Sequence, residues 1–138
     1  MNKIASIVQH NMDEFCKDEI VIYKGETYTF FDSGLTRNVF VNEDKTRVIK
    51  FLNGDRIIDH NQEEFDIYEN ASEEKKKELA ITTIDVGIIE QEFCNPVKFD
   101  ERKMTIKQML FARSCRHEVG WNKNGELVCF DLNEYKRY

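Results

Sequence analysis

The sequence predicts an α+β fold, in which a small twisted antiparallel sheet is backed by an N-terminal helix and a helical layer. Two observations favour this class. Short segments in which apolar and polar residues alternate follow one another closely, separated by turn residues such as Lys24-Gly25 and Asn124-Gly125. A longer stretch of helix-forming residues, 61–80, divides these segments into two groups. Strands that follow one another through short turns are typical of antiparallel pairing.

The chain of 138 residues is predicted to be one domain, because it is long enough for a core and contains no linker rich in Pro, Gly or Ser. Within it we expect an N-terminal helix in residues 1–19, a core in 20–133 and a short charged tail in 134–138. The formal net charge of −6 makes nucleic acid an unfavourable partner, because proteins that bind the phosphate backbone need a basic face.

Composition also bears on compartment and metal content. Neither a signal peptide nor a membrane-spanning segment is recognisable, so we expect a cytoplasmic protein with no membrane partner. The four cysteines are widely spaced and form no CxxC motif, which predicts free thiols in a reducing compartment. The three histidines make no ligand pattern with cysteines or carboxylates, so we predict no metal site.

The first part of the chain is predicted to hold one helix and four strands. Apolar residues recur at helical spacing in Asn2–Cys16, which predicts the N-terminal helix. Strand-forming residues with turns between them predict strands at Ile20–Tyr23, Thr27–Phe31, Asn38–Asn42 and Arg47–Leu52.

Helices and a hairpin are predicted next. A helix is expected at Asn61–Asn70, with Phe65 and Tyr68 facing inward. A second helical piece is expected at Ser72–Ala80, because Ser72 is a favourable N-cap. The segments Ile81–Asp85 and Ile88–Phe93 then form a hairpin around Val86-Gly87.

The last part is predicted to hold a helix and a terminal hairpin. Residues 97–100 are expected to be extended. Thr105 is predicted to cap a helix that runs to about Arg116. Asn124-Gly125 is the strongest two-residue turn signal in the chain, and it joins Trp121 to a strand at 126–131. We expect Trp121 to lie in the core.

Lys50 is a cation inside the otherwise apolar strand Arg47–Leu52. Glu64, on the helix predicted to follow, is its candidate partner, and we expect a contact between the two side chains. One interpretation is structural: Glu64 compensates a partly buried charge, or the lysine reaches solvent from an edge strand. The other interpretation is that Lys50 contacts a ligand.

Several segments resemble, in order and spacing, the ATP-binding lobe of the protein-kinase-like family. Gly34 with Arg37–Phe40 is similar to a reduced glycine-rich loop and its valine strand, and Val48–Phe51 resembles the V-A-I-K strand that carries the lysine. The segment Asn61–Phe65 resembles the helix of the partner glutamate, here Glu64.

The resemblance continues toward the C-terminus. Residues 88–94 are similar to the strand and hinge that hold adenine, with Gln91 at the gatekeeper position. Residues 125–132 resemble the strand pair that leads to the D-F-G motif, with Asp131 as the metal-binding aspartate. A compressed pattern of this kind is similar to small phage-encoded kinase-like proteins. The resemblance implies a nucleotide-binding set of Gly34, Val39, Lys50, Glu64, Glu92, Cys94 and Asp131.

The sequence departs from this family where catalysis takes place. The phosphate loop has one glycine in place of three, and Leu35, Thr36 and Arg37 would crowd a bound phosphate. By the family's spacing, the catalytic aspartate falls near Arg113 and the metal-binding asparagine near Glu118. Neither residue type does the family's chemistry, so we predict no catalytic residue and no cofactor, although the resemblance itself would imply ATP and magnesium.

The function predicted from these features is that of a catalytically inactive kinase-like interaction module, a phage-encoded regulator or inhibitor that binds a host or viral protein. One alternative is a nucleotide sensor or ATP-dependent phosphotransferase that uses Lys50, Glu64 and Asp131. Another alternative is a structural component of a viral assembly. Near the end of a predicted helix, Arg113, Arg116 and His117 either complement the helix dipole or form an anion or partner site.

Overall fold

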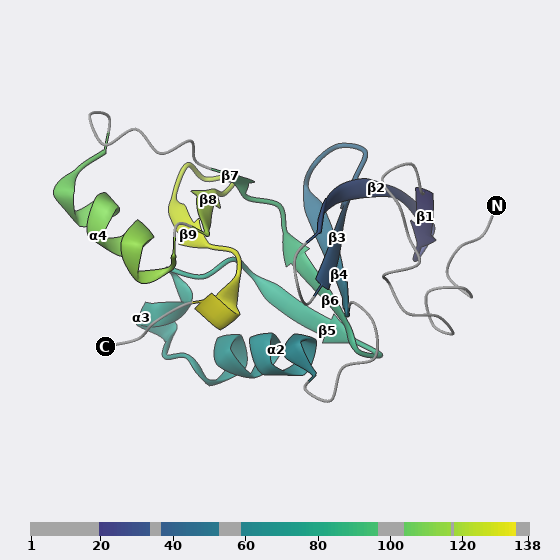
Figure 1. Cartoon of the computed structure of the whole chain (residues 1–138), viewed down its shortest axis with the longest axis horizontal. Coiled ribbons are helices and arrows are strands. Elements are labelled where there is room, and N and C mark those ends of the chain that lie inside the picture. Colours follow the sequence, from purple (N-terminus) through teal and green to yellow (C-terminus); the bar gives the residue numbers. More distant parts are fainter. Residues whose placement is uncertain (1–19, 34–36, 53–58, 97–103, 117, 135–138) are drawn as a thin grey trace.

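The computed structural model describes residues 20–33, 37–52, 59–96, 104–116 and 118–134. The predicted helix Asn2–Cys16, the predicted extended segment 97–100, Gly34 and His117 lie outside these residues. The described part is α+β, as predicted, with a six-stranded sheet, a smaller three-stranded sheet and a few short helices (Figure 1).

The larger sheet is antiparallel throughout and has the strand order β1-β2-β3-β4-β6-β5. Its strands are β1 (Ile20–Tyr23), β2 (Glu26–Ser33), β3 (Arg37–Asn42), β4 (Arg47–Leu52), β5 (Thr82–Asp85) and β6 (Ile88–Glu92). Each predicted strand of this group is present, and β2 extends beyond its predicted bounds at both ends. Because β6 inserts between β4 and β5, β4 is an interior strand, which excludes the interpretation of Lys50 as an edge-strand lysine.

Two of the hairpins turn through residues with positive φ. Lys24 and Gly25 have φ of 49° and 82°, and Val86 and Gly87 have φ of 50° and 78°. Positive φ at both central residues is what a tight two-residue hairpin loop requires. Val86 is unusual in this place, because a β-branched residue rarely adopts the left-handed conformation.

The two faces of the larger sheet differ in chemistry. Ile49 and Phe51 of β4 point to one face, where Phe40 of β3 packs edge-on against Phe51 with ring centroids 5.9 Å apart. Lys50 and Val48 point to the opposite face, because side chains alternate along a strand. The apolar face forms the first core, which consists of Val21, Tyr23, Tyr28, Phe40, Ile49, Phe51 and Ile88.

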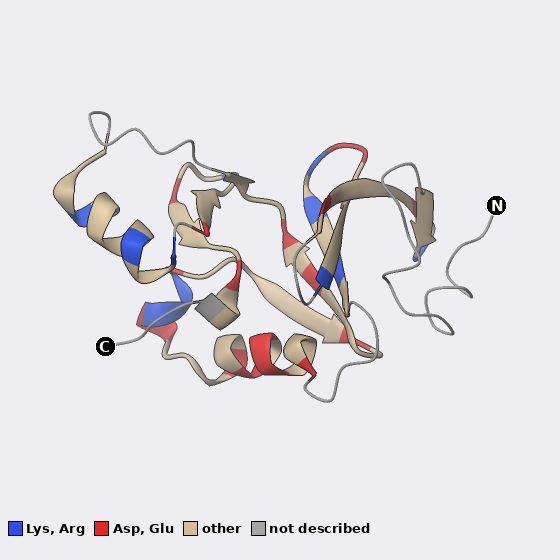
Figure 2. Cartoon of the chain, viewed as in Figure 1, with Lys and Arg blue, Asp and Glu red and all other residues tan. Residues whose placement is uncertain are grey.

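The helix α2 (His60–Asn70) lies against the face that carries Lys50 and contacts β4, β5 and β6 (Figure 1). Asp59 caps its start by accepting hydrogen bonds from the backbone N–H groups of Asn61 and Gln62. Phe65 and Tyr68 are half-buried. In Figure 2 acidic residues mark the ribbon of α2, both acidic and basic residues mark α3 (Glu73–Lys76), and basic residues mark α4 (Ile106–Ser114).

The second helical piece is shorter than predicted. The helix α3 covers Glu73–Lys76, with Ser72 as its N-cap, and the prediction that it runs to Ala80 is wrong. Beyond a short turn, Leu79 forms a parallel bridge with Cys129, and the Ala80 N–H donates to the Cys129 carbonyl at 2.9 Å. This non-local pairing satisfies backbone groups that a longer helix would have paired locally.

The smaller sheet is antiparallel and has the order β7-β8-β9, with β7 (Asn95–Pro96), β8 (Val119–Trp121) and β9 (Leu127–Cys129). A Cβ atom on Gly120 would lie 2.7 Å from the Asn95 carbonyl oxygen, so this close approach of β7 and β8 requires glycine. Trp121 is half-buried at the wall of a surface hollow, so its predicted place in the core is wrong.

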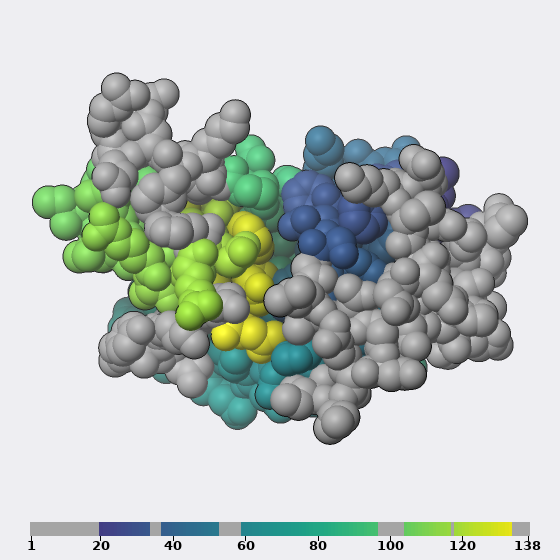
Figure 3. Space-filling model, viewed as in Figure 1, coloured from purple at the N-terminus to yellow at the C-terminus, as the bar shows by residue number. Residues whose placement is uncertain are grey.

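The helix α4 (Ile106–Ser114) begins as predicted, because Thr105 forms a capping box with Gln108. A 3-10 helix, η3 (Leu132–Glu134), follows β9 and lies beside α2. In Figure 3, β9 and η3 (yellow) reach the surface between α4 (green) and the β2–β3 strands (blue). The second core joins α4, β8, β9 and η3 and consists of Leu79, Ala112, Cys115, Val119, Cys129 and Leu132.

Candidate functional site

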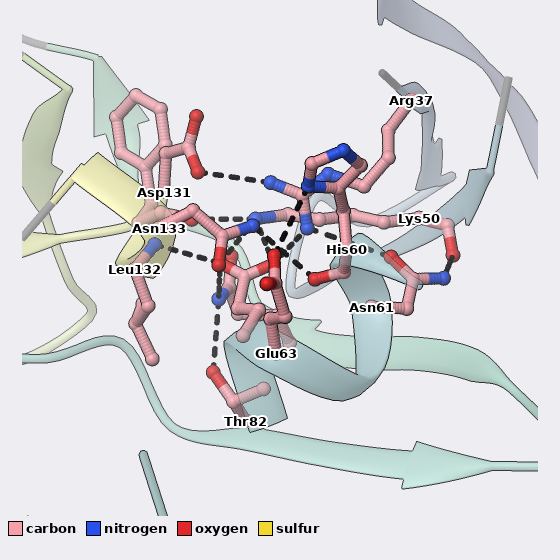
Figure 4. Close-up of polar contacts among 12 residues, drawn as sticks. Arg37, Lys50, His60, Asn61, Glu63, Thr82, Asp131, Leu132 and Asn133 are labelled. Atoms are coloured by element: carbon pink, nitrogen blue, oxygen red, sulfur yellow. Dashed lines mark hydrogen bonds and ion pairs between the residues drawn. The ribbon is translucent and has the colours of Figure 1, made fainter. Parts of the chain in front are cut away.

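Four charged side chains from separate elements meet on the face of β4 that α2 covers (Figure 4). Lys50 Nζ lies 3.0 Å from Glu64 Oε2 and 3.1 Å from Oε1, which confirms the predicted contact. Arg37 donates to the same carboxylate through Nη1 and to Asp131 Oδ1 through Nη2, the latter at 2.9 Å. We call Arg37, Lys50, Glu64 and Asp131 the ion-pair cluster.

Strand register brings the two cations together. Val39 of β3 pairs with Lys50 of β4, and Arg37 pairs with Leu52. Because the side-chain period of a strand is two, Arg37, Val39 and Lys50 project to one face of the sheet, with Arg37 diagonal to Lys50. Both cations are therefore aimed at the helix on that face.

Asn61 fixes the helix above them. Its side-chain amide is fully buried and donates to two backbone carbonyls, that of Lys50 at 2.9 Å and that of Gly87 at 2.8 Å. The start of α2 is thereby tied both to β4 and to the β5–β6 turn. Glu64 follows three residues later on the same side of the helix and so lies over Lys50.

The Glu64 carboxylate is fully buried and remains charged. In addition to Lys50 and Arg37, it accepts a hydrogen bond of 2.8 Å from the Leu132 backbone N–H. Burial by itself would raise the pKa of Glu64, but the two cations and the Leu132 N–H outweigh burial and lower it to about 2.

Arg37 compensates two carboxylates at once. Its side chain is 7% exposed, and that of Asp131 is 30% exposed. Burial lowers the pKa of Arg37, but Glu64 and Asp131 raise it by more, so the net shift is upward and the guanidinium stays charged. The cluster holds two cations and two carboxylates, so its own charges balance.

Lys50 uses all of its hydrogen-bonding capacity within the protein. Its ammonium group has three donors, and its acceptors are both oxygens of Glu64 and the Phe130 carbonyl at 2.6 Å. Gln91 lies beside the cluster and donates to Thr82 Oγ1 at 2.9 Å and, more weakly, to Glu64 at 3.5 Å.

A cavity of about 140 Å³ adjoins the cluster on the side of β6 and the segment that follows it. Glu64 lies behind Lys50, outside the lining, and Gly34 lies outside the described residues. The other members of the predicted nucleotide-binding set all line this cavity, namely Val39, Lys50, Glu92, Cys94 and Asp131.

The hinge-like segment on this cavity is held in place by its neighbours. Ile81 donates its backbone N–H to the Glu92 carboxylate at 2.7 Å, and the Phe93 N–H donates to the Thr46 carbonyl at 3.0 Å. Burial, followed by the charge of Glu92, raises the pKa of the Cys94 thiol to about 12. Cys94 is therefore a neutral, weakly polar part of the wall near neutral pH.

A larger open hollow of about 720 Å³ lies next to the cavity and is lined by Arg47, Ile81, Glu90 and Trp121, among others. It shares Gln91, Glu92 and Phe93 with the smaller cavity but contains no member of the ion-pair cluster. The chemistry that the sequence singled out is therefore concentrated at the smaller cavity.

The basic residues predicted as an anion or partner site lie away from the cluster. Arg113 is exposed in the last turn of α4, where a cation complements the helix dipole, and Arg116 is exposed just beyond the helix end. Neither lines the cavity. His117, the third member of that predicted site, lies outside the described residues.

The roles of Arg37 and Asn61 do not follow from the sequence. The resemblance to kinases makes Arg37 an obstacle in a phosphate loop, whereas in the structure it is the third charged group of the cluster. Its position two residues before Val39 could have indicated this role, because the alternation of side chains along a strand places Arg37 and Val39 on the same face. No local pattern indicates that Asn61 would bridge Lys50 and Gly87.

Comparison of the chain with protein-family models, curated proteins and solved structures gives no match. Among the described residues, no group of three or more His, Cys, Asp or Glu side chains is arranged to hold a metal ion. The same part of the chain contains no helix that is both long and apolar enough to cross a membrane.

Proposed function

We propose that the protein is a non-catalytic, kinase-like binding module that regulates or inhibits another protein by contacting it. The observation that supports this most is the hydrogen bond of 2.9 Å from Arg37 to Asp131. In the resemblance to kinases, Asp131 is the residue that binds magnesium. Here a guanidinium already compensates its charge.

The residues of the cluster are not suited to bind magnesium and a nucleoside triphosphate. A divalent cation at Asp131 would lie beside the Arg37 guanidinium, which already pairs with Asp131 Oδ1, so the two positive charges would repel each other. Lys50 directs its donors to Glu64 and the Phe130 carbonyl, and has none left for a phosphate. Pockets for drug-sized ligands usually measure about 300–1,000 Å³, well above the cavity here.

Phosphotransfer tests this proposal directly. Purified protein is incubated with labelled ATP, magnesium and general protein acceptors, beside a Lys50→Met variant. We expect the same background signal from both chains, because the lysine serves as a structural cation. Transfer by the wild-type chain that Lys50→Met abolishes would refute the proposal.

A nucleotide sensor is the second candidate, and one observation favours it: Val39, Lys50, Glu92, Cys94 and Asp131 line a single cavity. Thermal unfolding with ATP and magnesium distinguishes the two candidates. A ligand at a hundred times its dissociation constant adds about 2.7 kcal/mol to the free energy of unfolding. Stabilisation that is lost in Lys50→Met would favour the sensor, and no shift at millimolar nucleotide would favour the binding module.

The partner is tested by capture from cell extract followed by reconstitution. A captured protein is purified separately, and its affinity for the wild-type chain is measured by calorimetry. We expect a saturable complex of defined stoichiometry that forms equally well with and without ATP. A candidate that fails to bind in purified form, or that binds only when ATP is present, would contradict the proposal.

A further inference from the structure

The cavity beside the ion-pair cluster has the size of one aromatic ring. Its volume of about 140 Å³ is close to the ~150 Å³ that holds a benzene molecule in a protein interior. Three phenylalanines, Phe31, Phe93 and Phe130, contribute to its lining. Phe31 and Phe93 pack edge-on with their ring centroids 5.6 Å apart, so this side of the cavity is preformed.

The charges on the lining favour a positive ligand. Four acidic and two basic residues line the cavity, and both basic side chains, Arg37 and Lys50, are bound to Glu64 behind the wall. Asp32 is exposed at the end of β2 and accepts one hydrogen bond, from the backbone N–H of Ser33 at 2.8 Å. Aromatic faces attract cations as well, most strongly where water is excluded.

A buried acceptor also lacks a donor. Gln91 is 2% exposed and lines the cavity, and its side-chain nitrogen donates to Thr82 and Glu64. Among the described residues, Gln91 Oε1 is the buried side-chain atom that has no hydrogen-bond partner. Buried polar atoms normally have partners, so this oxygen indicates a place for a ligand N–H group.

We propose that this cavity binds a small planar organic cation that carries N–H donors, such as an aromatic amidine or amine. The ring lies among Phe31, Phe93 and Phe130. The charged end lies toward the Asp32 carboxylate and presents an N–H group to Gln91. This inference goes beyond the proposed function, because it concerns a small-molecule ligand and holds whether or not a protein partner binds elsewhere.

Three probes with the same ring separate charge from size: benzamidine is a cation, benzamide is neutral, and benzoate is an anion. Each is titrated into the full chain by calorimetry and by nuclear magnetic resonance. We expect benzamidine to bind at least about tenfold more tightly than benzamide, and benzoate to bind most weakly. Equal affinities for benzamidine and benzamide, or no binding of benzamidine, would overturn the proposal.

Variants then locate the site. Asp32→Asn keeps the hydrogen-bond acceptor and removes the charge, so it should weaken benzamidine binding by about fivefold and leave benzamide binding unchanged. The matched control is Glu69→Gln, which removes an exposed carboxylate of α2 outside the lining. If Glu69→Gln weakens benzamidine binding as much as Asp32→Asn does, the effect comes from the overall charge of the protein, and the assignment of the site is overturned.

Two further measurements keep the test independent of folding defects. Val39→Phe fills the cavity from its wall, so it should abolish benzamidine binding while the unfolding transition stays cooperative. Phenyltrimethylammonium carries the charge without an N–H donor and should bind more weakly than benzamidine. Equal binding of these two cations would overturn the role of Gln91. Failure of every probe would overturn this inference and leave the result of the phosphotransfer assay unaffected, so this inference and the proposed function fail separately.

Discussion

The two faces of β4 are buried in different ways, one in an apolar core and the other in a cluster of charged side chains. On one face, Ile49 and Phe51 join an apolar core in which the stabilisation comes from area removed from water. On the other face, one residue away along the same strand, Lys50 is 4% exposed and belongs to a charged cluster. Burial of those charges is tolerated because each has an opposite charge and hydrogen-bond partners.

The two faces differ in how strictly they determine the arrangement of the side chains that pack on them. An apolar core accepts side chains of similar volume, because its interactions have little direction. The charged face accepts only one arrangement, because Arg37 and Lys50 must both reach Glu64, and Leu132 must donate its N–H to the same carboxylate. The ion-pair cluster therefore fixes how α2, the sheet and the segment after β9 are assembled.

Removal of the shared anion should have the largest effect. Glu64→Leu leaves Lys50 and Arg37 buried with less compensation, and breaking a buried pair in this way costs about 3–5 kcal/mol. We expect a loss of about 5 kcal/mol in the free energy of unfolding by urea, because Lys50 loses its ion-pair partner and Arg37 loses one of its two. Glu69→Leu, at an exposed position of the same helix, is the control and should change stability by less than about 0.5 kcal/mol. Similar losses in the two variants would show that the cluster does not hold the fold together.

The apolar face should give the next effect. Phe40→Ala removes a fully buried ring from the first core, and such a deletion costs about 3–5 kcal/mol, so we expect about 4. Phe31→Ala, at a ring that is 40% exposed, should cost clearly less. Urea unfolding followed by circular dichroism measures both. A larger loss in Phe40→Ala than in Glu64→Leu would reverse the order of the two faces.

Acid should weaken the charged face alone. The pKa of Glu64 is about 2 in the folded protein, below its ordinary value of 4.5. A lowered pKa of this kind contributes stability that is fully present above pH 4.5 and is lost as the pH falls toward 2. The contribution is about 3 kcal/mol at 1.36 kcal/mol per pKa unit.

Unfolding by urea between pH 6 and pH 2 measures this effect, with Glu64→Gln as the variant that cannot titrate. We expect the stability of the wild-type chain to fall more steeply below pH 4.5 than that of Glu64→Gln. Parallel pH profiles for the two chains would contradict a charged, compensated Glu64.

A turn that serves the charged face should give the smallest effect, and in the stabilising direction. Val86 has φ of 50° and is 85% exposed, so its side chain gains little from burial and occupies a strained conformation. Val86→Asn creates the favoured Asn-Gly pair for this hairpin and should raise stability by about 1 kcal/mol. Thermal unfolding measures it, with Val86→Ala as the control that keeps the strain. An equal gain from alanine would show that relief of the left-handed strain is not the cause.

Much of the architecture followed from local sequence. Alternation predicted the strands around Lys50, Thr105 predicted the start of α4, and the glycine turns predicted the hairpins. The contact of Lys50 with Glu64 was also accessible, because a buried lysine requires a carboxylate and the helix that follows offers one. The length of α3 was not accessible, since the pairing of Leu79 with Cys129 ends it from a distant part of the chain.

By itself, the sequence determined which side chains share a face and where the chain turns, because strand period and backbone preference are local properties. Only the tertiary structure decided that Arg37 spans 94 positions along the chain to compensate Asp131. It also decided that Asn61 fixes α2 to the sheet and that Gln91 Oε1 faces no donor among the described residues. Those contacts depend on how separate elements pack together. A local pattern within one segment cannot predict which residue of a distant segment will contact it.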